Sequence, residues 1–233
     1  FNMVFEVAQQ AGFMDNSHNA VHVNFGSVMD SDGKILKSRE GEVIKLVDLL
    51  REAVTRAEQA ITEKNPELKG TQREEIAKAI GIGAVKYADL STERTKDYVF
   101  DWDRMLAFEG NTAPYLQYAH ARICSIFRRS GTERSSLSGI SISLSRPEEL
   151  LLARRLVNFA AVTDDTLDTY SPHRLCTYLH SVASAFATFY EVCPVLGAED
   201  EATRGSRMAM CDLTARTIST GLGLLGIDSP EQM

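Results

Sequence analysis

A short loop between residues 32 and 42 carries the side chains best suited to chemistry on phosphate. Lys34, Lys37 and Arg39 lie there with the hydroxyl of Ser38 and two glycines, directly after a stretch that alternates like a strand. Cations on such a loop can stabilise charge that develops on a transferring phosphate chain. The same composition also suits a solvated surface turn, so the residues alone leave both interpretations open.

A second candidate site is formed by two tyrosines and an arginine at helical spacing. Thr112 with Pro114 predicts the start of a helix. In that helix Tyr115, Tyr118 and Arg122 share a face. Exposed aromatic rings can stack on RNA bases, and an arginine can contact a phosphate. We expect one of the two tyrosines to pack in the protein interior instead.

Other potential sites are weaker. The spacing of His18 and His22 would suit two metal ligands on a helix, but no glutamate follows the first histidine and the segment resembles a loop leading into a strand. We therefore expect no metal site. No glycine-rich phosphate loop of the Walker or dinucleotide type is present. The remaining histidines suggest no catalytic triad, and the four cysteines lie far apart, as free thiols do.

The charge of the chain limits its partners. A net charge of −7 argues against indiscriminate nucleic-acid binding and against a DNA partner, so any contact with nucleic acid must be local. All basic residues from 112 onward are arginines, which suit phosphate recognition, although a codon bias would give the same pattern. We find no signal or transmembrane segment and expect a cytoplasmic protein. The chain opens with Phe1 inside an apparent helix, which suggests a fragment.

The periodicity predicts a mainly α fold. A strand over 21–28 precedes a helix over about 43–64. Capping-box patterns at Thr71–Glu74 and Ser145–Glu148 predict two helix starts, the second helix running to about 161. Further helices are expected over 115–129, from Ser171–Pro172 to about 189, and over 201–222, with a polar surface loop over 130–145. Residues from about 71 onward therefore read as an all-α bundle.

Three long strings in this order resemble arginyl-tRNA synthetases, namely residues 22–42, 81–90 and 100–123. The resemblance implies a helical bundle anticodon-binding domain over 71–233. It also implies that residues 1–70 are the C-terminal remnant of a class I Rossmann-type α/β catalytic domain. The family's first signature, His-x-Gly-His, is absent, and so is the arginine pocket that the family builds upstream.

The resemblance also implies roles for particular residues. The loop Lys37-Ser38-Arg39 matches a degenerate form of the second class I signature, usually written KMSKS. Lys37 and Arg39 are then the catalytic cations for ATP, and Ser38 belongs to the same ATP site. The strand would place His22, Phe25 and Gly26 beside the adenine and ribose.

On the anticodon side, the resemblance assigns Tyr115, Tyr118, Arg122 and the terminal Met233 to tRNA binding. The implied activity attaches arginine to its tRNA through an arginyl adenylate made from ATP, with Mg²⁺ expected to arrive with the ATP. Two alternatives remain: a stand-alone tRNA-binding module without ligase activity, and a helical scaffold that binds other proteins.

Overall fold

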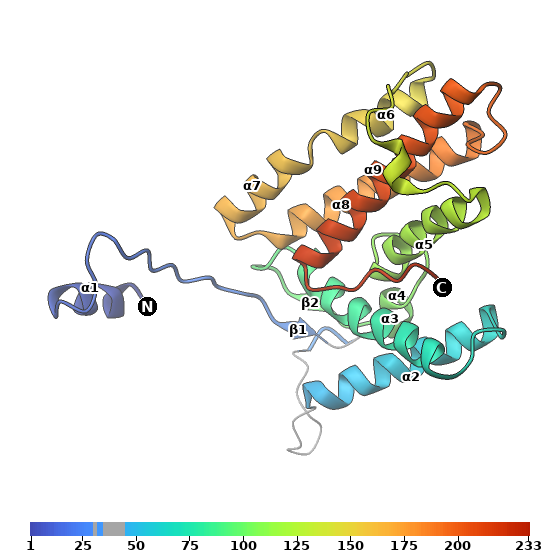
Figure 1. Ribbon diagram of the computed structural model, residues 1–233. Helices are drawn as coiled ribbons and strands as arrows, with labels where there is room; N and C mark the ends of the chain where they lie inside the picture. Colours follow the sequence, from blue (N-terminus) through green and yellow to red (C-terminus); the bar gives the residue numbers. More distant parts are fainter. Residues whose placement is uncertain (30–31, 35–44) are drawn as a thin grey trace.

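Helices make up most of the computed structural model, which describes residues 1–29, 32–34 and 45–233 (Figure 1). The elements in chain order are α1 (Asn2–Gln10), β1 (Val28–Met29), α2 (Leu46–Lys64), α3 (Gly70–Ser91), β2 (Tyr98–Val99), α4 (Trp102–Met105), α5 (Ala113–Ser130), the 3₁₀ helix η2 (Arg134–Leu137), α6 (Pro147–Leu156), α7 (Phe159–Thr169), α8 (Pro172–Val192) and α9 (Glu201–Leu224). The prediction of a mainly α fold is confirmed. None of the described helices is long and apolar enough to cross a membrane.

The N-terminal residues extend away from the helical body, with α1 at the far end of an extended run (Figure 1). No residue of α1 is buried. β1 pairs in parallel with β2, with Val28 opposite Tyr98. The strand predicted over 21–28 is therefore wrong in extent, because among the described residues only Val28 and Met29 find a partner strand there.

α2 and α3 pack closely and share a buried apolar cluster. Ala57 and Ile61 of α2 meet Ile76, Ala77 and Ile80 of α3. α3 starts at Gly70 after an N-cap that makes no side-chain cap bond, so the capping box predicted at Thr71 is wrong. The domain boundary predicted after residue 70 stays a prediction.

A glycine explains how closely these two helices approach. A Cβ atom built on Gly81 would lie 2.6 Å from the backbone carbonyl oxygen of Ala53 in α2. Glycine lowers helix propensity. The helix nevertheless continues through Gly81 to Ser91, because the packing of α2 against α3 stabilises it.

The C-terminal bundle is built around α5, α8 and α9. The side chain of Thr112 accepts a hydrogen bond from the backbone N–H of Tyr115, which confirms the predicted start of α5, and Gly131 ends this helix with a left-handed backbone at φ 65°. Two apolar clusters fill the bundle, one of them centred on Leu116, Leu179 and Leu222. Tyr87 joins α3 to this core, since its buried hydroxyl donates to the carbonyl oxygen of Cys176 at 2.9 Å.

The helix predicted from 145 to 161 is two helices, α6 and α7, separated at residues 157–158. Its cap also lies one residue later than predicted. The carboxylate of Glu149, rather than Glu148, accepts hydrogen bonds from the backbone N–H groups of Ser145 and Arg146, at 2.8 and 3.0 Å.

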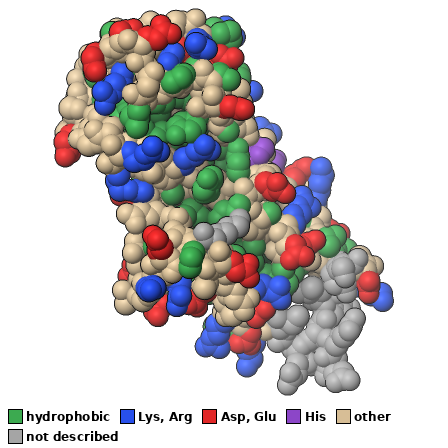
Figure 2. All heavy atoms as spheres, turned by 90° about the vertical axis from the view of Figure 1, so that its right-hand side faces the viewer, with side chains coloured by type: hydrophobic (Ala, Val, Ile, Leu, Met, Phe, Trp, Pro, Cys, Tyr) green, Lys and Arg blue, Asp and Glu red, His purple; other side chains and the backbone are tan. Residues whose placement is uncertain are grey.

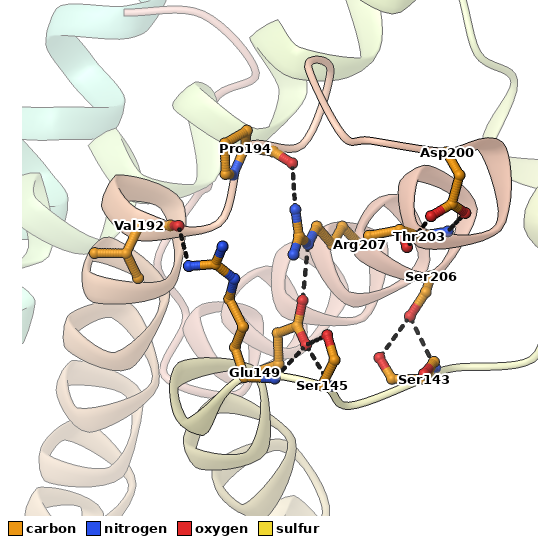
Figure 3. Close-up of polar contacts among 10 residues, drawn as sticks. Ser143, Ser145, Glu149, Val192, Pro194, Asp200, Thr203, Ser206 and Arg207 are labelled. Carbon is orange, nitrogen blue, oxygen red and sulfur yellow. Dashed lines mark hydrogen bonds and ion pairs between the residues drawn. The ribbon is translucent and has the colours of Figure 1, made fainter.

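The same carboxylate forms a buried ion pair with α9 (Figure 3). Arg207 donates from Nε to Glu149 at 2.7 Å and from a terminal nitrogen to the carbonyl oxygen of Pro194 at 2.8 Å. Burial alone would raise the pKa of Glu149, but the hydrogen bonds from Arg207, Arg146 and Ser145 lower it overall. The network thus joins α6, α9 and the segment after α8.

Candidate nucleic-acid interface

The outer face of α5 borders a surface hollow of about 430 Å³. The end of α2 and the C-terminal residues of the chain complete its walls. The residues that line it are Asn65, Leu68, Tyr118, Ala121, Arg122, Ser125, Arg128, Gln232 and Met233. Three of the four side chains predicted to bind tRNA, those of Tyr118, Arg122 and Met233, therefore lie around one hollow.

Tyr118 and Arg122 are the exposed members of this group. Tyr118 is 47% exposed, so part of its ring is open to solvent. The guanidinium of Arg122 lies 4.4 Å from the ring centroid of Tyr190 in α8. This cation–π contact holds the charge close to the protein surface while the side chain as a whole stays exposed.

Tyr115 lies in a different environment. Its ring packs against the buried cluster of the bundle and lies 5.6 Å from the ring of His180. The residue is half-buried, and it does not line the hollow of Tyr118. One of the two tyrosines thus packs against the interior, as expected, and the expectation that Tyr115, Tyr118 and Arg122 form one surface holds for only the last two.

Met233 reaches the hollow because the chain folds back after α9. Its side chain packs against the α2–α3 cluster, and its backbone carbonyl oxygen lies 3.4 Å from the side-chain nitrogen of Asn65. Arg128 donates to the carbonyl oxygen of Glu231 at 2.9 Å, so this cation is engaged by the chain's own C-terminal segment.

Some of the basic side chains lie beside apolar surface. Figure 2 shows several Lys and Arg side chains across the middle of one face next to apolar surface, with other basic and acidic side chains spread over the rest of that face. Such a mixture of cations and apolar groups suits a ligand with a charged backbone and flat, uncharged rings.

Of the residues predicted to bind ATP, only His22, Phe25 and Gly26 are described. The imidazole of His22 stacks on the ring of Phe1 with centroids 4.2 Å apart, and the side chain of Phe25 is 86% exposed. Lys37, Ser38 and Arg39 lie outside the described residues.

Gly26 has a structural reason to be glycine. Its backbone N–H donates to the carbonyl oxygen of Arg94 at 2.6 Å. A Cβ atom at this position would lie 2.2 Å from the carbonyl oxygen of Lys96, a distance that forces the two segments apart. The loop between α3 and β2 therefore requires a glycine here whether or not ATP binds nearby.

Sequence reasoning missed the residue that joins these segments. Arg94 donates to the backbone and side-chain oxygens of Asn24 at 2.9 and 2.7 Å, and to the carbonyl oxygen of Tyr170 at 3.0 Å. Three segments far apart in the sequence meet at this guanidinium, and no periodicity in the sequence indicates such a contact.

Two family models match the chain. The DALR anticodon binding domain matches residues 116–233, and the catalytic domain of class I tRNA synthetases of the arginine type matches residues 1–102. Among curated proteins, the arginine–tRNA ligase of Cellvibrio japonicus is 51% identical over 231 residues, which are 99% of this chain and 40% of the relative. That of Edwardsiella ictaluri is 49% identical and covers 97% of this chain and 39% of its own length.

Solved structures agree with these matches. The arginyl-tRNA synthetase of Thermus thermophilus superposes with a TM-score of 0.81 at 33% identity, over 91% of this chain and 35% of that one. The enzyme of Plasmodium falciparum gives 0.84 at 27% identity, over 100% of this chain and 39% of that one. The chain thus spans about 40% of the length of the curated relatives it matches.

Proposed function

This chain belongs to the arginyl-tRNA synthetase family, and we propose that it supplies the anticodon-binding surface and part of the ATP site of an arginine–tRNA ligase. The observation that supports this most directly is the hollow where Tyr118, Arg122 and Met233 meet. The ligase makes an arginyl adenylate from ATP and transfers arginine to the end of its tRNA. Because no covalent enzyme intermediate is needed, the protein acts by positioning and by charge stabilisation.

The hollow can hold an unstacked base of the anticodon loop. The exposed ring of Tyr118 offers a stacking surface, and the thioether of Met233 adds an adaptable apolar contact. Arg122 lies one helical turn beyond Tyr118, so a base stacked on the ring brings its phosphate toward the guanidinium. Tyr115, which packs against the bundle, contributes by supporting α5.

In the N-terminal part of the chain, Lys37 and Arg39 bind the phosphates of ATP, and Ser38 lies in the same site. His22, Phe25 and Gly26 lie near the adenosine. The exposed ring of Phe25 is available for contact with a base. Mg²⁺ enters with ATP; among the described residues no group of three or more His, Cys, Asp or Glu side chains could hold a metal ion. The arginine pocket belongs to the part of the ligase upstream of this chain. The division at residue 70 and a cytoplasmic location are part of the same proposal.

Binding measurements with tRNA for arginine test the anticodon surface. Tyr118→Ala should weaken binding by about 1–3 kcal/mol, whereas Tyr118→Phe, which keeps the stacking ring, should bind normally. Arg122→Ala should weaken binding and lower its salt dependence. Arg154→Ala, which removes an exposed arginine from α6, is the matched control for loss of charge.

Unchanged affinity in folded Tyr118→Ala and Arg122→Ala proteins would refute the assigned surface. ATP–pyrophosphate exchange separates the ligase from the alternative, a tRNA-binding module without ligase activity. A polypeptide that continues upstream into a His-x-Gly-His sequence should exchange, and failure to do so in the presence of tRNA would favour the module.

A further inference from the structure

The last eight residues, 226–233, form a C-terminal strap that crosses from the end of α9 over α3 and α5 to the end of α2 (Figure 1). It has no helix or strand of its own. Side chains from those other elements hold it through its backbone carbonyls. The pairs are Lys86 with Gly226, Gln117 with Asp228, His120 with Pro230, Arg128 with Glu231, and Asn65 with Met233.

Gln117 is the most deeply buried of these donors, at 0% exposure. Its side-chain nitrogen donates to the carbonyl oxygen of Asp228 at 2.7 Å and to that of Ala79 in α3 at 3.0 Å. Its amide oxygen has no hydrogen-bond partner among the described residues. Burying an amide with an unpaired oxygen is unfavourable. The two hydrogen bonds that the side-chain nitrogen donates to backbone carbonyls offset this cost.

His120 holds the next part of the strap. Its Nδ1 lies 3.1 Å from the carbonyl oxygen of Pro230, which can only accept, so this nitrogen carries a proton. Its Nε2 lies 3.7 Å from the thiol of Cys124, which can donate to it. Burial lowers the pKa of His120 and so favours this neutral form.

The backbone of α3 is shaped to receive the strap. A Cβ atom on Gly83 would lie 3.0 Å from the side-chain nitrogen of Gln117 and 3.1 Å from a methyl group of Ile227. Ile227 is itself buried in the bundle core, which anchors the start of the strap independently of Gln117. The strap is thus fixed at Ile227. From there to Met233 it is held by side chains of α5, by Asn65, and by side-chain hydrogen bonds of Ser229 with Ser219 and of Gln232 with Gln72.

We propose that Gln117 is a positioning residue for tRNA binding: by fixing the carbonyl of Asp228, it sets the path of the strap so that Gln232 and Met233 complete the hollow beside Tyr118 and Arg122. This inference rests on the proposed function. Gln117 does not line the hollow. Its effect on binding passes through the strap.

A double-mutant cycle on tRNA affinity tests this role. The variants of the 233-residue chain are Gln117→Leu, a chain that stops after Ile227, and the combination of the two. Stopping after Ile227 should weaken binding about tenfold or more, since it removes Met233 and one wall of the hollow. Gln117→Leu should weaken binding at least about threefold in the full strap and have no further effect in the shortened chain. If Gln117 had a purely structural role, Gln117→Leu would weaken tRNA binding by the same factor in the full chain and in the chain that stops after Ile227.

Folding is checked by circular dichroism and urea denaturation before binding is measured. If Gln117→Leu does not fold, Gln117→Met, which fills similar space without a donor, replaces it in the cycle. Unchanged affinity of the chain that stops after Ile227 overturns the proposal. Tyr118→Ala and Arg122→Ala distinguish a failure of the proposed anticodon surface from a failure of the positioning role of Gln117. If they weaken binding and the strap variants do not, only the role of Gln117 fails. If none of the variants weakens binding, the proposed anticodon surface fails as well.

Discussion

Replacing Arg207 with methionine tests how much the buried ion pair between α6 and α9 stabilises the protein. The side chains of Arg207 and Glu149 are only 7% and 1% exposed, and their nearest atoms are 2.7 Å apart (Figure 3). Methionine fills similar space without a charge or a hydrogen-bond donor. The variant therefore leaves the carboxylate of Glu149 buried without its cation.

The size of the effect follows from what Glu149 retains. Removing one partner of a buried pair typically costs about 3–5 kcal/mol. Glu149 keeps the two backbone N–H donors and the hydroxyl of Ser145, at 2.8–3.1 Å, which partly stabilise its charge. We therefore expect a loss of about 3 kcal/mol, at the lower end of that range.

Urea denaturation at pH 7 measures this loss, and Arg204→Met is the matched control. Arg204 lies one turn earlier on α9, and its pair with Glu201 is on the surface, with the two side chains 34% and 89% exposed. Surface pairs contribute about 0–1 kcal/mol, so the control should stay close to wild type. A loss in Arg207→Met no larger than that of the control would refute the reasoning.

The pH dependence gives a second check on the same variant. In the wild type the pKa of Glu149 is lowered on folding, so its contribution is present above the ordinary carboxyl value of 4.5 and lost as pH falls through the folded value. Without Arg207, fewer hydrogen bonds oppose the effect of burial, so we expect the pKa of Glu149 to rise and its protonation to stabilise the variant at low pH. The deficit of Arg207→Met should shrink as the pH falls from 7 toward 4.5; a deficit independent of pH would point to packing alone.

Two further predictions concern the helix contact and the ATP loop. Gly81→Ala should destabilise the chain by about 1–3 kcal/mol in urea denaturation, because its Cβ would meet the backbone of α2 at 2.6 Å, whereas Gly223→Ala, with nothing within 4 Å, should be neutral or stabilise by up to about 1 kcal/mol; equal effects would contradict the close approach. In a complete ligase, Lys37→Ala and Arg39→Ala should each slow adenylate formation on the order of 100-fold in single-turnover assays, because these cations stabilise charge on the phosphates. Wild-type rates in both variants would indicate that the loop is only a solvated surface turn.

Local patterns in the sequence determined most of the helices. Apolar residues at three- and four-residue spacing predicted α2, α3, α5, α8 and α9, and the cap at Thr112 predicted where α5 begins. These signals are local, because an amphipathic helix and its cap depend on residues a few positions apart. They also placed Tyr118 and Arg122 one turn apart on α5.

The predictions of a strand over 21–28 and of the α6 cap at Glu148 were wrong. The strand over 21–28 needs a partner, and β2 offers only Tyr98 and Val99. The cap of α6 falls on Glu149, whose carboxylate also binds Arg207, 58 residues away in the sequence. Pro147, at the first helical position, is the local signal that favours Glu149 over Glu148 as the capping residue.

The candidate tRNA surface shows the same division. Helical spacing placed Tyr118 and Arg122 on one face and the family resemblance added Met233, but only the folded chain brings Met233 to the other two, through a strap held by Gln117 and His120. Those two polar side chains lie on the buried face of α5. Their partners are backbone carbonyls about 110 residues away. Contacts to backbone do not depend on the identity of the contacted residue, so a single sequence carries no sign of them.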